Sequence, residues 1–141
     1  MAYIFREEEL PKLISVNPGR ERTFLVNQEL ANTGDLLAGV TRDQPGAATP
    51  DISLNGEHFY LILEGHGVME TEQGSHPVGP GTMIFIRAAE VGSNPGHRLR
   101  ATDSALRYFE LQTPAPVVES KAVDGMAGWK RIDGTVWVRT N

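Results

Sequence analysis

Short apolar and β-branched stretches, separated by glycine, proline and asparagine, recur along most of the chain. The clearest are segments 57–63 (EHFYLIL), 82–87 (TMIFIR) and 106–112 (LRYFELQ). Each is too short for a stable helix between its flanking turn signals, and its residue types are those of β-strands. Because segment 57–63 is almost wholly apolar, we predict a strand that is buried on both faces.

Weaker strand signals fill the rest of the chain at short spacing, at 23–27, 36–41, 51–54, 68–72 and 97–101. Turn signals such as Asn55-Gly56 separate them. About eight or nine short strands between turns are typical of an all-β fold, here an antiparallel β-barrel or jelly roll. We expect one domain over 1–141, with its core at 23–112.

The two ends of the chain give different signals. Segment 5–14 predicts one helical turn or a short N-terminal helix, which Pro11 limits because proline cannot donate a helical backbone hydrogen bond. Segment 113–141 opens on a proline-rich break but contains both tryptophans, Trp129 and Trp137. Two large aromatic side chains are rare in a disordered tail, so we expect this segment to dock on the barrel as a C-terminal arm.

Composition narrows the range of functions. The chain has 141 residues, a formal net charge of -5 and no cysteine. An acidic balance argues against nucleic-acid binding, which requires clustered lysine and arginine, and the lack of cysteine excludes disulfides and thiolate chemistry. No apolar run reaches the ~20 residues that span a bilayer, and the N-terminal segment does not match a signal peptide. We therefore expect a cytoplasmic protein that binds neither nucleic acid nor membrane.

The centre of the chain resembles the first motif of the cupin superfamily, G-x5-H-x-H-x3-4-E-x6-G. The two glycines of the motif correspond to Gly46 and Gly65, and the spacing between them is kept. Ile52 and Leu54 stand at the positions of the two histidines, and His58 stands at the position of the glutamate. The framework therefore matches the family, whereas the metal-binding residues do not.

The second cupin motif, G-x5-P-x-G-x2-H-x3-N, matches at Pro80-Gly81 and the strand that follows. With a lengthened loop, His97 takes the position of the motif histidine. The resemblance spans 45–112 and implies a small β-barrel. It also implies a homodimer, because cupins commonly pair through sheet edges or exchanged terminal strands, and segment 113–141 is the candidate for such an exchange.

In the family, three histidines and one glutamate hold a divalent transition metal. Ile52 and Leu54 lie two residues apart on one strand face, and neither side chain can donate a lone pair to a metal. We therefore expect no metal cofactor. If a divalent transition metal is bound, His58 and His97 are its expected ligands, completed by a carboxylate such as Glu57.

We predict a cavity with an apolar lining, in which His58 and His97 act on a substrate as general acid and base. Isomerase, cyclase and lyase reactions need only proton transfers, so they do not depend on a metal. An apolar lining favours a hydrophobic or aromatic small molecule as the ligand. The expected substrate-binding residues are Ile52, Leu54, Tyr60, Ile62, Phe85 and Arg87.

Two other functions fit the same residues. A non-catalytic ligand-binding or sensing barrel would keep the cavity without proton transfer, and a metal-dependent oxygenase or lyase would require a rebuilt set of ligands. Among the arginines, Arg87 is the one expected at the mouth of the barrel, where it could bind a carboxylate or phosphate. Arg20 and Arg22 are expected on solvated faces.

Overall fold

The computed structural model describes residues 2–10, 12–15, 17–26, 31, 33–49, 56–87, 96–114 and 129–131. The predicted strand 51–54, with Ile52 and Leu54, and most of the 113–141 arm lie outside these residues. Nearly all of the regular structure within them is antiparallel β-sheet. The predicted all-β fold is therefore confirmed.

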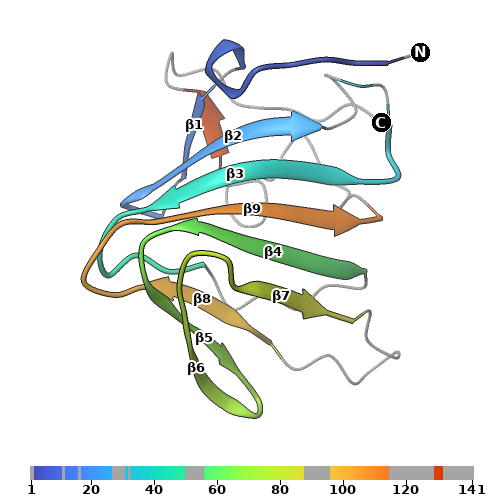
Figure 1. Ribbon diagram of the computed structural model, residues 1–141. Helices are drawn as coiled ribbons and strands as arrows, with labels where there is room; N and C mark the ends of the chain where they lie inside the picture. The colour runs from blue at the N-terminus through green and yellow to red at the C-terminus, as the bar shows by residue number, and fades with distance from the viewer. Residues whose placement is uncertain are drawn as a thin grey trace.

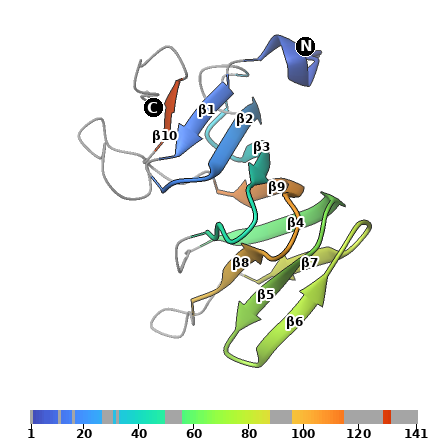
Figure 2. The same cartoon turned by 90° about the vertical axis from the view of Figure 1, so that its left-hand side faces the viewer.

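The elements of the described residues are, in chain order, η1 (Glu7–Glu9), a 3-10 turn, and the strands β1 (Lys12–Ser15), β2 (Arg20–Val26), β3 (Leu37–Asp43), β4 (Glu57–Glu64), β5 (Gly67–Thr71), β6 (Gly74–Val78), β7 (Met83–Ile86), β8 (Arg98–Ala101), β9 (Leu106–Thr113) and β10 (Trp129–Arg131). They form a seven-stranded sheet, β10-β1-β2-β3-β9-β4-β7, and a three-stranded sheet, β6-β5-β8. Figures 1 and 2 show the smaller sheet at the β4–β7 end of the larger one. One face of the larger sheet is therefore turned toward the interior.

The strand predicted from the EHFYLIL segment forms as β4, but it is not buried on both faces. His58, Tyr60 and Ile62 are fully buried, whereas the alternate residues Phe59 and Leu61 are only partly buried. β4 lies between β9 and β7, so its backbone is paired on both edges while the outer face of the sheet stays partly open. The continuous apolar run thus reflects apolar side chains on both an inner and an outer face.

At the N-terminal end the described residues form one helical turn and no longer helix, and elsewhere the structure contains a strand, β6, that the pattern did not indicate. The helix expected over 5–14 is limited to η1, and the residues after Pro11 form β1, which pairs with β2. Pro11 ends the helical turn, and the residues after it gain backbone hydrogen bonds by pairing with β2. The pattern also gives no signal for β6, because this strand is an exposed sheet edge that contains Pro77 and so lacks apolar alternation.

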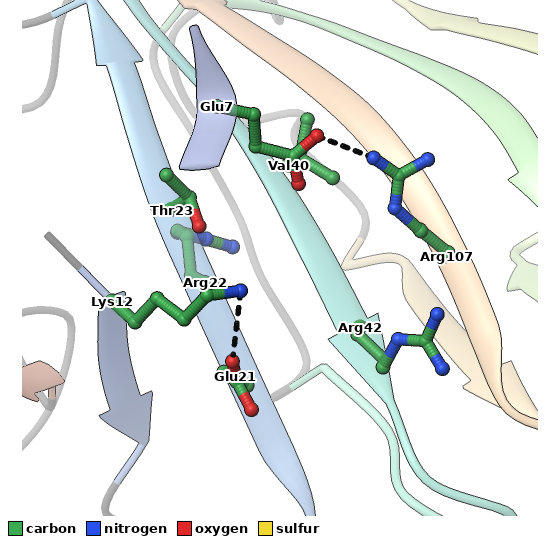
Figure 3. Close-up of a pocket in the computed structure, with 8 residues that line it drawn as sticks. All are labelled: Glu7, Lys12, Glu21, Arg22, Thr23, Val40, Arg42 and Arg107. Atoms are coloured by element: carbon green, nitrogen blue, oxygen red, sulfur yellow. Dashed lines mark hydrogen bonds and ion pairs between the residues drawn. The ribbon is translucent and has the colours of Figure 1, made fainter. Parts of the chain in front are cut away.

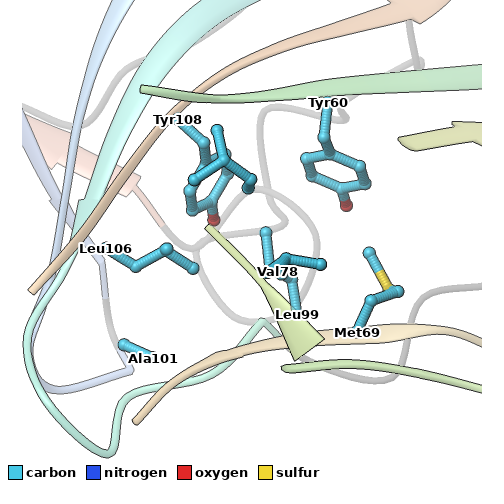
Figure 4. Close-up of a cluster of buried hydrophobic side chains, with 8 residues drawn as sticks. Tyr60, Met69, Val78, Leu99, Ala101, Leu106 and Tyr108 are labelled. Carbon is cyan, nitrogen blue, oxygen red and sulfur yellow. The ribbon is translucent and has the colours of Figure 1, made fainter. Parts of the chain in front are cut away.

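The apolar part of the core lies between the two sheets. Tyr60 and Tyr108 project from β4 and β9 of the larger sheet toward Met69 and Leu99 of the smaller one (Figure 4). Burial of each large apolar side chain contributes about 1.5–3 kcal/mol. Ile62 belongs to this cluster and is buried, whereas its expected contact with a substrate stays a prediction. Its members are Tyr60, Ile62, Met69, Val78, Leu99, Ala101, Leu106 and Tyr108.

The larger sheet extends beyond the predicted core of 23–112. β1 pairs with β2 on one edge and with β10 on the other, so that Leu13 lies opposite both Arg22 and Arg131. β10 belongs to the C-terminal arm, and its pairing confirms that part of the arm docks on the barrel. No helix in the described part of the chain is long and apolar enough to cross a bilayer.

Gly65, between β4 and β5, and Gly46 adopt nearly the same left-handed backbone, with φ of 82° and 84°. A Cβ on Gly65 would lie 1.9 Å from the carbonyl oxygen of Ala105, whereas one on Gly46 would meet nothing within 4 Å. We therefore expect Gly65→Ala to lower the free energy of unfolding by at least about 3 kcal/mol. Gly46→Ala should lower it by about 1 kcal/mol. Urea denaturation measures both, and equal losses would contradict the close packing of this turn.

Candidate functional site

The inner face of the larger sheet is polar over β2, β3 and parts of β9 and β4. Strand registers place Arg22 opposite Thr41, and Gln112 opposite His58. The buried polar side chains of this face, which we call the interior polar cluster, are Arg20, Arg22, Thr41, Asp43, His58, Glu110 and Gln112. A buried charge without a partner is strongly unfavourable. The pairing of these groups therefore decides what the cluster can do.

Arg20, Asp43 and Tyr108 form a closed group at one side of the cluster. Arg20 Nε donates to Asp43 Oδ1 at 2.9 Å, and Arg20 Nη2 donates to Tyr108 Oη at 3.2 Å. Tyr108 Oη donates to Asp43 Oδ2 at 3.0 Å. Burial and then the charge of Asp43 raise the pKa of Tyr108, so the phenol keeps the proton that this bond requires. The three groups satisfy one another, which points to a structural role.

Arg22 connects β2 to Glu110 of β9 across the intervening β3. Its Nε donates to Thr41 Oγ1 at 2.7 Å, and its Nη2 forms an ion pair with Glu110 Oε1. Gly39 lies opposite Glu110 in the register, and a Cβ there would lie 2.9 Å from the carbonyl oxygen of Thr23, next to Arg22. The absence of a side chain at Gly39 therefore lets the backbones of β2 and β3 approach closely at the point where Arg22 crosses β3.

Glu110 in turn orients His58. Glu110 Oε2 lies 3.2 Å from His58 Nε2, and both side chains are almost completely buried. Burial by itself would raise the pKa of Glu110, but the charge of Arg22 and the hydrogen bond from His58 lower it to about 2. The carboxylate is therefore ionised and acts as an acceptor. In the neutral form of His58, Nε2 then carries the proton and Nδ1 keeps a lone pair.

Two further rings pack against His58. The Tyr60 ring lies 4.1 Å from it between centroids, and His97 meets it edge-on at 5.4 Å. Tyr60 Oη lies 3.4 Å from His97 Nε2. Burial and then the charge of Glu110 raise the pKa of Tyr60 well above its usual value, so the phenol keeps its proton, and it donates to His97 in the tautomer whose Nε2 carries no proton. The structure thus brings the two predicted histidines together.

Two buried polar atoms beside these rings make no hydrogen bond within the described part of the chain. They are His58 Nδ1 and Gln112 Oε1. Gln112 faces His58 across the β4–β9 pair, and its amide nitrogen lies 3.4 Å from His58 Nε2. Buried polar groups are nearly always hydrogen-bonded. These two atoms are therefore the points at which a ligand or water would bind.

The prediction that Phe85 lines the interior was wrong. Phe85 pairs with Phe59 on the outer face of β7 and β4 and is 52% exposed. Side chains alternate across a strand, so the inner positions belong to Ile84 and Ile86, which pack against the core. Arg87 is exposed directly after β7.

The homodimer implied by the resemblance stays a prediction.

The expectation that Arg20 and Arg22 lie on solvated faces was also wrong. Both are buried, because each has a carboxylate partner on another strand. Glu110 and Gln112, which contact His58, belong to no motif. A signal for them was present, since both alternate in phase with the core residue Leu106 along β9. Their partners, however, lie far away in sequence and cannot be matched from one strand's pattern.

The described residues do not fit the metal centre that the resemblance implies. No group of three histidine, aspartate or glutamate side chains suited to a metal gathers within them. His58 and His97 are adjacent, but His58 Nε2 and both oxygens of Glu110 are engaged in the ion-pair chain with Arg22. A guanidinium thus occupies the carboxylate that a divalent cation would require.

A shallow pocket of about 120 Å³ lies on the outer face of β1, β2, β3 and β9, beside η1 (Figure 3). The cations on its rim form ion pairs, Lys12 with Glu21, Arg42 with Glu64, and Arg107 with Glu7. Exposed and partly exposed pairs of this kind contribute little energy and leave no net charge to select a ligand. The interior polar cluster is therefore the better candidate site.

Several solved structures share this architecture. The chain superposes with a TM-score of 0.66 on a cupin-superfamily sugar phosphate isomerase from Silicibacter pomeroyi, at 20% identity over 96% of each chain. The polyketide cyclase RemF from Streptomyces resistomycificus gives a TM-score of 0.66 at 20% identity, over 86% of this chain and 89% of that one. KdgF from Halomonas sp. gives 0.65 at 18% identity, over 79% and 94%. No protein-family model and no curated protein sequence matches the chain.

These similarities confirm the cupin fold that the two motifs imply. At such identities they do not assign a reaction, because one fold supports many activities. The chemistry of the interior is therefore argued from its own side chains.

Stability should depend on pH through Glu110. Its pKa is lowered from 4.5 to about 2 in the folded protein, so its contribution is fully present above the unfolded value and is lost as the pH falls from about 4.5 toward 2. Between pH 6 and pH 3 the wild type should lose about 2 kcal/mol more unfolding free energy than Glu110→Gln. Urea denaturation at the two pH values measures this difference.

Two further variants control this experiment. Glu8→Gln removes one carboxylate from the exposed N-terminal turn and corrects for the change in net charge. If Glu110→Gln does not fold because Arg22 is left unpaired, the double variant Arg22→Met/Glu110→Gln removes both charges and serves in its place. A wild type and a Glu110 variant with the same pH dependence would contradict the ionised, paired state of Glu110.

Proposed function

We propose that this cupin-fold protein is an enzyme that moves protons within a single small molecule, in an isomerase, cyclase or lyase reaction. His58 is its general base, and Glu110 and Arg22 hold that base in position. The observation that carries this proposal is the connected chain from Arg22 through Glu110 to His58, which ends at a buried nitrogen with a lone pair.

The position of Glu110 matches the requirement for a histidine base. A carboxylate on one ring nitrogen fixes the tautomer and stabilises the imidazolium that forms when the other nitrogen takes a proton. Glu110 has that position at Nε2, so Nδ1 of His58 is the atom that accepts the substrate proton. Arg22 keeps Glu110 ionised. The carboxylate therefore stabilises the charged ring without taking its proton.

Tyr60 and His97 provide a second proton-bearing pair next to the base. The Tyr60 phenol keeps its proton and hydrogen-bonds to His97, whose ring edge lies against His58. A proton removed by His58 can return to a different substrate atom from either histidine. Because one proton leaves and one returns, the reaction needs no oxidant or reductant.

The side chains of the interior also narrow the chemical class of the expected ligand. The Tyr60 ring, which is fully buried and packs against His58, makes the surroundings of the base partly aromatic. The unpaired atoms of His58 and Gln112 additionally favour a ligand with a polar group that can hydrogen-bond to them. The isomerase and the cyclase among the similar structures are consistent with a small-molecule substrate.

The proposal predicts that His58→Gln abolishes turnover while ligand binding is kept. The wild type is first tested on a panel of one-substrate isomerisation, cyclisation and elimination reactions, followed by NMR in D2O. Loss of the general base should lower turnover of the responding substrate at least about 100-fold. Equilibrium dissociation constants should change little, because Gln keeps the size and polarity of the side chain. The exposed His66→Gln is the matched control and should retain activity.

Two outcomes would overturn the proposal. Turnover that survives in His58→Gln would exclude this residue as the base. Ligand binding without turnover in the wild type, unchanged by the substitution, would identify a binding protein instead of an enzyme.

A further inference from the structure

We infer that Gln112 is a second catalytic residue, whose amide N–H donates to the substrate oxygen on which negative charge develops while His58 removes the neighbouring proton. The substrate class is then a neutral carbonyl compound with a C–H bond next to the carbonyl, such as a ketone or hydroxyketone. This inference rests on the proposed role of His58 as the base and adds the group that binds the oxygen.

Gln112 and His58 are neighbours near the ends of their strands. They face each other in the β4–β9 register, with His58 second in β4 and Gln112 next to last in β9. Gln112 is 8% exposed and His58 is fully buried. Both side chains point to the inner face at the same rim of the sheet. A ligand that enters at this rim would meet the two groups together.

The proton on His58 Nε2 decides which end of the Gln112 amide faces the ring and which end is free. His58 Nε2 donates to the ionised Glu110, so the same nitrogen cannot accept an N–H from Gln112. The oxygen and nitrogen ends of an amide have nearly the same shape, so the Gln112 amide can be turned over in place. The contact between Gln112 and His58 is favourable when the amide oxygen, an acceptor, faces the N–H of the ring. In this orientation the NH2 group occupies the position given above for Gln112 Oε1, where no hydrogen-bond partner lies within the described residues. The donor end of the Gln112 amide, whose other end lies 3.4 Å from His58 Nε2, is then free next to the ring that carries the base nitrogen.

A donor next to a base is the arrangement that enolate formation requires. His58 Nδ1 takes a proton from the carbon beside the carbonyl, the C–H electron pair forms a C=C bond, and the carbonyl π pair moves onto oxygen. That oxygen accepts the hydrogen bond from Gln112. Return of the proton to a different atom gives an isomer. Attack of the enolate carbon on a second carbonyl of the same molecule gives a ring, because the π pair of that carbonyl moves onto its oxygen, which then takes the proton from His58. Both outcomes balance without a redox partner.

The charges of the cluster favour a neutral substrate over a phosphate or carboxylate. Arg20 faces Asp43 and Arg22 faces Glu110, so both buried cations are compensated by carboxylates. An anionic ligand would have to separate one of these pairs or approach Glu110, and either costs free energy. A ketone oxygen carries no full charge before the reaction and requires only a hydrogen-bond donor.

The test is exchange of the carbon-bound protons of hydroxyacetone and cyclohexanone in D2O, followed by ¹H NMR. The wild type should catalyse the exchange, and His58→Gln should abolish it. Gln112→Met keeps the length of the side chain but has no N–H, and should slow the exchange about 100-fold, as expected for loss of one oxyanion donor. Gln73→Met changes an exposed glutamine and should leave the rate unchanged.

The outcomes separate this inference from the proposed function. Exchange that depends on His58 but is unchanged in Gln112→Met would keep the base and overturn the role of Gln112. A wild type that exchanges neither ketone would overturn the carbonyl class, while the role of His58 is judged by the reaction panel. If Gln112→Met does not fold, the side-chain ¹⁵N–¹H resonances of the wild type are followed as hydroxyacetone is added. Shifts at both His58 and Gln112 support the inference, and any other pattern overturns it.

Discussion

A charged group enclosed by a β-barrel must find its partner inside, and the ion pair between Arg22 and Glu110 shows how this protein meets that constraint. The pair spans three strands, because Arg22 leaves β2, passes Gly39 of β3 and ends at β9. Removing one member of such a pair typically costs about 3–5 kcal/mol, because the other charge stays buried. The position of Glu110, and through it that of His58, is therefore fixed by the same interaction that makes the polar interior possible.

The inner face of the larger sheet divides into two parts with different tasks. The rings of Tyr60 and Tyr108 pack against the smaller sheet and build an apolar core. On the same face, Arg22 and Glu110 form a rigid support for His58. Tyr60 belongs to both parts, since its ring packs in the core and its hydroxyl reaches His97. Rigid placement of this kind is what proton transfer requires, because the base must stay aligned with its substrate.

The fold follows from the sequence more directly than the site does. Apolar segments and glycine positions, such as Gly65 against Ala105, reflect local geometry and predict most of the strands and turns of the described core, though not the strands β1 and β6. His58 and His97 were found through motif positions, and their contact needs only the barrel to close. Phe85 was assigned to the wrong face of its strand. Side chains alternate between the two faces, and its neighbours Ile84 and Ile86 are the ones that face the interior. The buried state of Arg22 could not be predicted, because its partner is 88 residues away and only the sheet register brings the two together.

The central claim is that Glu110 holds His58 with its proton on Nε2 and a free lone pair on Nδ1. The ¹⁵N NMR spectrum of selectively labelled wild-type protein reports this directly, because protonated and unprotonated ring nitrogens differ in chemical shift and in coupling to the ring protons. The account predicts that neutral His58 is protonated at Nε2 and unprotonated at Nδ1. A neutral ring with its proton on Nδ1 would contradict it.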